Sequence, residues 1–291
     1  MAAPLALILG IALALTVKNP WPAQTKKLQT WLLQGSVVAL GAGMNLSVLL
    51  RVGASGIGYT VLGISVTFAL TWVLMRVLQT ERVTSLLIGT GTAICGGSAI
   101  AAAGPAIGAK SHEMSVALGV VFLLNGLALV IFPPIGHAVG MTQAQFGLWS
   151  ALAIHDTSSV VGASMQYGPD ALTLATTVKL ARALWIIPVT AVLARVVPHE
   201  GGATKRSYPW FIVAFVAMAA LVSFVPALTE PGKQLAALAR WTLVASLFFV
   251  GLGVSKEALK QVGIKPLILG VTLWVLVSAG TLAAILTTSA S

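Results

Sequence analysis

The stretch that decides the fold is VTSLLIGTGTAICGGSAIAAAGPAIGA, residues 83–109, which carries no charged side chain between Arg82 and Lys110. A hydrocarbon core of about 30 Å is crossed by roughly 20 helical residues, so this stretch is long enough to span a membrane. Its centre is the pair Gly96-Gly97, and each glycine inside a helix costs about 1 kcal/mol relative to alanine. We therefore expect a helix that is interrupted at mid-membrane and restarts near Ser98.

The composition of the whole chain agrees with a membrane protein. Of its 291 residues, 57% are hydrophobic and 8% are charged, and the mean hydropathy is +0.96. Soluble domains have about 25% charged residues, so a soluble fold and a disordered chain are excluded. The net charge of +10 does not indicate a nucleic-acid partner, because basic residues in a membrane protein record its orientation. The single cysteine, Cys95, excludes an internal disulfide and a cysteine metal cluster.

Charge-free intervals recur along the chain at membrane-spanning length. The runs are continuously apolar and do not alternate, which favours helices over strands. We predict an all-α polytopic membrane protein with one transmembrane domain, residues 1–291, two interrupted helices and an inverted-repeat transporter architecture. The ten predicted spans are 2–17, 30–50, 57–77, 83–107, 114–138, 142–167, 171–195, 207–227, 234–254 and 266–287.

Basic residues beside the spans predict the orientation. Eleven lie in or beside odd-numbered connections: Lys18, Lys26, Lys27, Arg76, Arg82, Arg195, Lys205, Arg206, Lys256, Lys260 and Lys265. Four lie beside even-numbered connections: Arg51, Lys110, Lys233 and Arg240. Because lysine and arginine accumulate on the cytoplasmic side, the odd connections are expected inside and both termini outside.

Two segments of the chain resemble each other. Residues Trp31 to Gly53 and Trp241 to Gly263 align without a gap, and eight positions are identical, among them Gly41 with Gly251 and Gly43 with Gly253. They belong to the second and ninth predicted spans, which run in opposite directions. This relation is typical of the inverted repeats of transporters. The other interpretation is that glycine, leucine and valine recur by chance in apolar helices.

Polar residues also occur at membrane depth in the sixth predicted span, in the sequence His155-Asp156-Thr157-Ser158. A carboxylate near the middle of a bilayer costs about 2.5–3.5 kcal/mol on insertion scales, so it normally faces a cavity or a partner. The same residues could instead cap a second half-helix. A histidine beside the carboxylate is able to exchange protons near neutral pH, so His155 and Asp156 are the candidate coupling residues.

The seventh predicted span holds Lys179 and Arg182 near its centre. Residues three apart share one helix face, and neither side chain reaches the water easily from there. The pair could neutralise Asp156. However, two cations against one carboxylate leave a surplus positive charge, which an anion pathway needs, and the fork of an arginine suits oxyanions.

These features define the candidate site. Its substrate-binding residues are Thr92, Cys95, Gly96, Gly97, Ser98, His155, Asp156, Thr157, Ser158, Lys179 and Arg182. No catalytic residue, metal ligand or cofactor is expected, and the chain contains no G-x-x-x-x-G-K-[ST] motif of an ATP-driven pump.

Three segments resemble one known family. IGTGTAICGGSAIAAAGPAI (88–107), GLWSALAIHDTSSVVGA (147–163) and VKLARALWIIPV (178–189) are similar to the hallmark segments of the YeiH-type, UPF0324 membrane proteins. Members of that family are described as sulfate exporters and are placed near the cation/proton antiporters and anion transporters. They usually have a further hydrophobic helix before the segment matching 2–17. The resemblance implies secondary transport across the bacterial inner membrane.

The expected function is therefore export of a small oxyanion, such as sulfate or an organosulfonate, by alternating access, with a proton or sodium as coupling ion. The first alternative is a cation/proton antiporter that uses Asp156. An enzyme with Cys95 as nucleophile and His155 as base, and a receptor or structural role, are the remaining alternatives. The lipid bilayer and a small anion are the expected partners, a homodimer is an allowed assembly, and no nucleic acid is expected.

Overall fold

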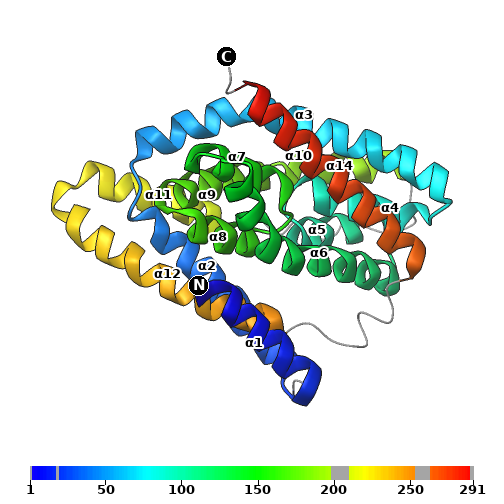
Figure 1. The fold of residues 1–291 in the computed structure, drawn as a ribbon, viewed down its shortest axis with the longest axis horizontal. Helices are drawn as coiled ribbons and strands as arrows, with labels where there is room; N and C mark the ends of the chain where they lie inside the picture. Colours follow the sequence, from blue (N-terminus) through cyan, green and yellow to red (C-terminus); the bar gives the residue numbers. More distant parts are fainter. Residues whose placement is uncertain (1, 18–19, 198–209, 253–262, 289–291) are drawn as a thin grey trace.

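The computed structural model describes residues 2–17, 20–197, 210–252 and 263–288, and every regular element in these ranges is helical (Figure 1). The predicted all-α class is confirmed. The longer helices are α1 (Ala2–Val17), α2 (Pro22–Gly41), α3 (Leu46–Leu78), α6 (Ser111–Ala138), α11 (Trp210–Phe224), α12 (Thr229–Leu252) and α14 (Ile264–Thr288). The shorter ones are α4 (Arg82–Ala93), α5 (Gly97–Ala106), α7 (Gln143–Ala153), α8 (Thr157–Tyr167), α9 (Pro169–Ala183), α10 (Ile186–Val196) and the 3-10 helix η1 (Pro226–Leu228).

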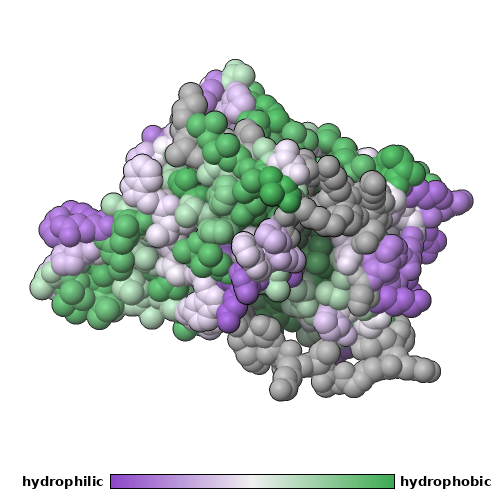
Figure 2. Space-filling model, turned by 90° about the horizontal axis from the view of Figure 1, so that it is seen from below, coloured by the Kyte–Doolittle hydropathy of each residue, from purple (hydrophilic) through white to green (hydrophobic). Residues whose placement is uncertain are grey.

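Several helices are long and apolar enough to cross a membrane. Four such stretches lie among the described residues: Gly58–Leu78, His112–Ala138, Pro169–Val196 and Ile264–Thr288. A fifth would require α11 and α12, which meet at a bend of 113°, to act as one span. Apolar side chains cover much of the face in Figure 2, and hydrophilic side chains gather towards the two ends of the long axis. The chain is a multi-pass membrane protein, but the predicted number of ten spans is not confirmed.

The fourth predicted span is interrupted, as expected, but its halves fold back on each other. Helix α4 ends at Ala93 and α5 begins at Gly97. A Cβ atom added at Gly91, near the end of α4, would lie 3.0 Å from Ile100 Cδ1 in α5. The carboxyl groups of Glu81, just before α4, and Glu113, in the first turn of α6, lie close enough to interact. Residues 82–106 therefore form a re-entrant helical hairpin, hairpin 1, whose two ends lie at the same face.

The sixth predicted span is also interrupted and also folds back. The hydroxyl groups of Ser150 in α7 and Ser164 in α8 are hydrogen-bonded at 2.8 Å. In a continuous helix these residues would be about 21 Å apart along the axis. At the other end, the backbone N–H of Asp170 donates to Gln143 Oε1 at 3.0 Å. Residues 143–167 form a second re-entrant hairpin, hairpin 2, so two of the ten predicted spans are folded back instead of running as single helices.

The two hairpins enter from opposite faces and meet in the middle. Helix α6, with 28 residues and a length of about 42 Å, runs from the end of hairpin 1 to the start of hairpin 2. The tip of hairpin 2 reaches the middle of α6, where the Asp156 N–H donates to Asn125 Oδ1 at 3.2 Å. A Cβ atom on Gly96, at the tip of hairpin 1, would lie 3.2 Å from Asp156 Cβ. The interruptions therefore bring together residues about 60 positions apart, deep in the protein.

Hairpin 1 changes the side of the membrane on which Lys110 is expected. Ten crossing spans would place Lys110 opposite Arg82, whereas hairpin 1 brings both to one face. The Arg82 guanidinium, at that face, donates to Val196 O at 3.5 Å, so the end of α10 with Arg195 lies there too. Since this clustering strengthens the basic excess at one face, we expect the hairpin 1 face to be cytoplasmic.

Cysteine labelling tests this topology. In a Cys95→Ser background, a membrane-impermeant maleimide added to spheroplasts is expected to label Asp170→Cys, which lies at the hairpin 2 face. Lys110→Cys is expected to react only after permeabilisation. Ten crossing spans would place both positions outside, so labelling of Lys110→Cys from the outside would contradict the re-entrant hairpin.

The helices α1, α2, α11 and α12 lie together along one side of the molecule, while α3 and α14 lie along the other, with the hairpins between (Figure 1). The two repeated segments pack against each other here. Ser36 is hydrogen-bonded to Thr242, and a Cβ atom on Gly43 would lie 2.8 Å from Ala236 Cβ, so α2 and α12 are antiparallel.

The matched glycines of the repeat, Gly41 and Gly251, both allow a close approach of helices. A Cβ atom on Gly41 would lie 2.5 Å from Phe215 O in α11. A Cβ atom on Gly10 of α1 would lie 3.0 Å from Gly251 Cα. Part of the second copy, residues 253–262, lies outside the described residues, so the inverted repeat stays a prediction.

Candidate functional site

The site forms where the tips of the two hairpins meet the middle of α9. This helix presents Lys179 and Arg182 one turn apart, and their side chains are 0% and 1% exposed. Both cations thus lie inside the protein at membrane depth. Each is held by backbone carbonyl groups at the ends of the interrupted helices.

Arg182 joins the two hairpins. Its Nε donates to Ala93 O, the last residue of α4, at 2.6 Å. Its Nη1 donates to Leu152 O, in the last turn of α7, at 2.7 Å. Its Nη2 is buried and has no hydrogen-bond partner, and a Cβ atom on Gly63 of α3 would lie 3.7 Å from it. One arm of the guanidinium therefore faces α3 with its hydrogens unused.

Lys179 binds the end of hairpin 2's first helix. Its Nζ donates to Ile154 O at 2.7 Å and lies 3.4 Å from Ala151 O. The last carbonyls of a helix lack intrahelical partners and form the negative end of its dipole. Both cations of α9 therefore stabilise the ends of α4 and α7.

Asp156 does not pair with these cations. The salt bridge among the described residues is on the surface, between Lys233 and Glu230, and neither Lys179 nor Arg182 is within 4.0 Å of the Asp156 carboxylate. Instead, Asp156 is the N-cap of α8, and its Oδ1 accepts from the Ser159 N–H at 2.6 Å. Ser158 and Ser159 follow in the first turn of α8, and both are buried. The hypothesis of a cap is supported, and a direct neutralising pair is not formed.

Several buried donors at the site remain unused. One is Arg182 Nη2 and another is Asn125 Nδ2. The other side-chain atom of Asn125, Oδ1, accepts from the Asp156 N–H. The ring of His155, 1% exposed, lies beside the Val121 backbone, and neither ring nitrogen makes a well-formed hydrogen bond. A buried unsatisfied polar group costs about 1–3 kcal/mol. Unused N–H groups close to two cations form an environment that suits a ligand rich in acceptor oxygens.

The structure brings together most, but not all, of the predicted site residues. Cys95 is buried at the turn of hairpin 1, between α4 and α5. Gly96 is at the tip of hairpin 1, and Ser158 is buried in the first turn of α8, after the N-cap Asp156. The other predicted residues are placed as follows: Thr92 is buried and donates to Ile88 O of its own helix, Thr157 is half-buried at the start of α8, Gly97 is half-buried against Phe122, and Ser98 is exposed.

The position of Ser98 is a correction to the predicted site. Helix α5 begins one residue earlier, at Gly97, and this register turns the Ser98 side chain away from the tip. The contact at the tip of hairpin 1 is made by Gly96, the residue before α5, which has a φ of +67°. This left-handed conformation is one that glycine adopts at no steric cost.

Two features of the site were not predicted from the sequence. Asn125 can be recognised in the sequence as a polar residue inside a predicted span, but nothing in the sequence links it to Asp156. The carbonyl groups of Ala93, Ala151, Leu152 and Ile154 give no signal, because a backbone acceptor is independent of residue type. No three side chains of His, Cys, Asp or Glu gather as metal ligands within the described ranges.

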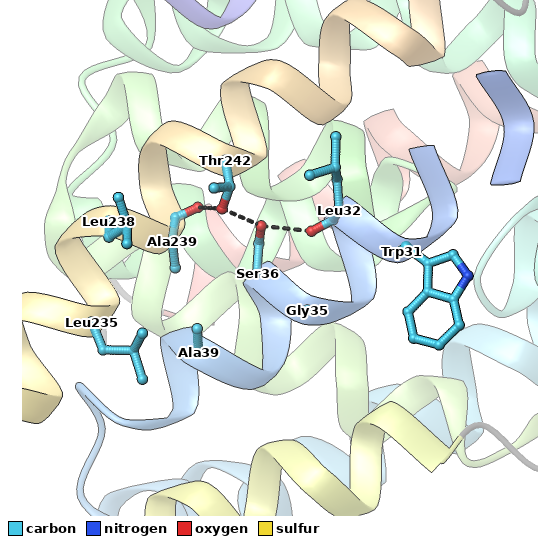
Figure 3. Close-up of a pocket in the computed structure, with 9 residues that line it drawn as sticks. All are labelled: Trp31, Leu32, Gly35, Ser36, Ala39, Leu235, Leu238, Ala239 and Thr242. Atoms are coloured by element: carbon cyan, nitrogen blue, oxygen red, sulfur yellow. Dashed lines mark hydrogen bonds between the residues drawn. The ribbon is translucent and has the colours of Figure 1, made fainter. Parts of the chain in front are cut away.

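A shallow groove of about 240 Å³ lies away from this site, between α2 and α12 (Figure 3). Its walls come from small and apolar residues, and its polar groups, Ser36 and Thr242, bind each other and carbonyls of their own helices. Trp31 lies at one end. The groove offers no charge to an anion, so we assign the candidate site to the hairpin tips.

The comparisons with known proteins agree with the three sequence segments. A family model described as "Conserved hypothetical protein 698" matches residues 1–270. A UPF0324 membrane protein of Bdellovibrio bacteriovorus is 57% identical over 285 residues, which cover 97% of this chain and 88% of that protein. The chain belongs to the UPF0324 family of membrane proteins.

Further relatives of this family are similar over nearly the same length. A UPF0324 membrane protein of Bacteroides thetaiotaomicron is 50% identical and covers 96% of this chain and 85% of its own length. One of Geobacter sulfurreducens is 49% identical, with 96% and 89% covered. No solved structure matches. Relatives in bacteria and apolar helices of spanning length place this UPF0324 protein in the bacterial inner membrane.

Proposed function

We propose that this UPF0324 protein is a secondary active transporter of a small oxyanion. The observation that carries the proposal is Arg182, a fully buried guanidinium at mid-membrane with one nitrogen, Nη2, that binds nothing in the protein. A charge in this position is stabilised by a partner or a cavity. The Asp156 carboxylate is occupied by its own helix, so the positive charge of Arg182 remains available to a ligand.

The surrounding backbone also favours an anion. Helices α5 and α8 both begin at the hairpin tips, so the N–H groups and positive dipole ends of two helices point towards the region of Arg182. The free Nη2 of Arg182 carries two N–H groups, and both can donate to the oxygens of an oxyanion. Sulfate or an organosulfonate is the substrate that the family resemblance implies, and export is the direction it implies.

The arrangement supports alternating access. The side chains of Lys179 and Arg182 are almost completely shielded at the hairpin tips, and this burial supports an occluded state as one step of the proposed cycle. Because hairpin 1 and hairpin 2 enter from opposite faces, withdrawal of one or the other would open the site to one side at a time. This is the general scheme of transporters with interrupted helices near the midplane.

A flux assay tests the proposal. Purified protein in proteoliposomes loaded with sulfate is expected to exchange external labelled sulfate at a rate at least about tenfold above protein-free vesicles. Sulfite and small organosulfonates in the lumen are the comparison substrates, and a quaternary ammonium chloride serves as the salt control. Rates equal to those of empty vesicles with every tested oxyanion would refute the proposal.

A second candidate function is cation/proton antiport, and the buried Asp156 carboxylate favours it. Asparagine caps a helix about as well as aspartate. If Asp156 serves as a cap, Asp156→Asn is expected to keep anion flux within about threefold of the wild type. If Asp156 carries the coupling proton, a sodium or potassium gradient moves protons without added anion, and Asp156→Asn abolishes that movement.

The capping role of Asp156 also leads us to propose transport and not catalysis. In the enzyme alternative, Asp156 would orient His155 as a base for Cys95. The Asp156 carboxylate instead accepts from Ser159 N–H, which leaves the histidine without an orienting partner. A Cys95→Ser variant is accordingly expected to keep the flux of the wild type.

A further inference from the structure

The end of helix α7 presents a row of backbone carbonyls that are occupied by cations. Helix α7 ends at Ala153, and the chain continues in extended conformation at Ile154. Lys179 Nζ is 2.7 Å from Ile154 O and 3.4 Å from Ala151 O. Arg182 Nη1 donates to Leu152 O, which lies between these two carbonyls in the sequence, at 2.7 Å. These oxygens thus accept hydrogen bonds from the cationic side chains of α9, where a continuing helix would supply backbone N–H groups.

Carbonyl groups at the C-terminal end of an interrupted helix are the kind of ligand that holds a coupling sodium ion or proton in transporters. The ammonium group of Lys179 occupies this position here. It is 0% exposed and is not within salt-bridge distance of the Asp156 carboxylate, so carbonyl oxygens are its described ligands. Neutral carbonyl oxygens of this kind are also ligands of bound sodium ions.

We infer that Lys179 stands in for a coupling sodium ion and carries a coupling proton. This inference rests on the proposed transport function. Of the two buried cations, lysine is the one that can release its proton, because a guanidinium stays protonated in proteins. The charged and titratable groups around it are Arg182 on its own helix, Cys95 at the tip of hairpin 1, and His155 and Asp156 at the tip of hairpin 2.

The charges then couple the proton to the anion. A protonated Lys179 and an anion on Arg182 attract each other, since both side chains lie on one face of α9. The two are therefore carried together and released on the same side. A dianion that leaves with one proton moves one net negative charge, so an inside-negative membrane potential favours export.

Sodium binding to the purified protein tests the inference without any transport assay. Thermal unfolding is measured in detergent in sodium chloride and in choline chloride of equal concentration. The wild type is expected to be insensitive to the exchange of cation. Lys179→Ala vacates the carbonyls and is expected to gain about 3–6 °C in sodium. The matched control Lys233→Ala, on the surface of α12, is expected to behave as the wild type.

If Lys179→Ala is not recovered in folded form, Lys179→Val is measured in the same way, since its short apolar side chain has no donor and also frees the carbonyls. Sodium stabilisation of the wild type would overturn the inference, and so would a folded Lys179 variant that does not respond to sodium. Neither result depends on anion flux, so a failure of the proposed function is recognised separately.

A second measurement concerns the proton. In proteoliposomes, an imposed pH gradient is expected to drive anion accumulation by the wild type. Lys179→Arg keeps the positive charge but exchanges no proton, so the ratio of pH-driven accumulation to anion exchange, both measured on the same variant, is expected to fall at least about tenfold below that of the wild type. A ratio equal to that of the wild type would contradict a proton carried by Lys179.

Discussion

Arg182→Ala is expected to abolish anion flux. Two charge-assisted hydrogen bonds from the guanidinium to an oxyanion, each worth about 1.5–3 kcal/mol, would be lost, which corresponds to a decrease of about 100-fold or more. The measurement is exchange of labelled anion in proteoliposomes, at equal amounts of folded protein. Since Arg182 also binds Ala93 O and Leu152 O, the variant is expected to unfold at a lower temperature than the wild type.

Two further variants separate charge from structure. Arg182→Lys keeps a positive charge and can bind one carbonyl, but it lacks the fork, so flux is expected to stay well below that of the wild type. Arg195→Ala lies on the same spanning stretch, where the exposed side chain donates to Ala191 O of its own helix, and it is expected to leave flux unchanged. Near-normal flux in a folded Arg182→Ala protein would place the anion site elsewhere.

Gly96→Val is expected to separate the two hairpin tips and to destabilise the fold. Gly96 has φ of +67°, and a side chain in such a conformation costs about 1–3 kcal/mol, with β-branched residues the least tolerated. The new Cβ would also lie 3.2 Å from Asp156 Cβ and 3.3 Å from Val121 Cγ1. We expect the unfolding temperature in detergent to fall by about 5–15 °C and anion flux to be lost.

The matched control is Gly58→Val on α3. A Cβ atom at Gly58 meets no atom within 4 Å, so the substitution is expected to change the unfolding temperature by about 2 °C or less. If Gly96→Val were as stable and active as Gly58→Val, the close contact between the tips of hairpin 1 and hairpin 2 would not be needed for function.

Much of the site was predictable from local sequence because a lipid environment penalises charge residue by residue. Charge-free runs indicate which segments lie in the membrane, whatever their neighbours are. The pair Gly96-Gly97 and the cap at Asp156 indicate where two helices stop, since both features act through the adjacent backbone. The interruptions predicted at these positions are confirmed by the ends of α4 and α7.

The sequence by itself thus determined the helical class, the family, the two interruptions and the buried cations Lys179 and Arg182. The tertiary structure decided that the interrupted segments turn back, and that their tips meet at α9. The physical reason is that an interruption fixes where a helix ends but not the angle at which the chain continues. That angle depends on contacts such as Ser150 with Ser164, and the cations bind carbonyl groups that every residue type possesses.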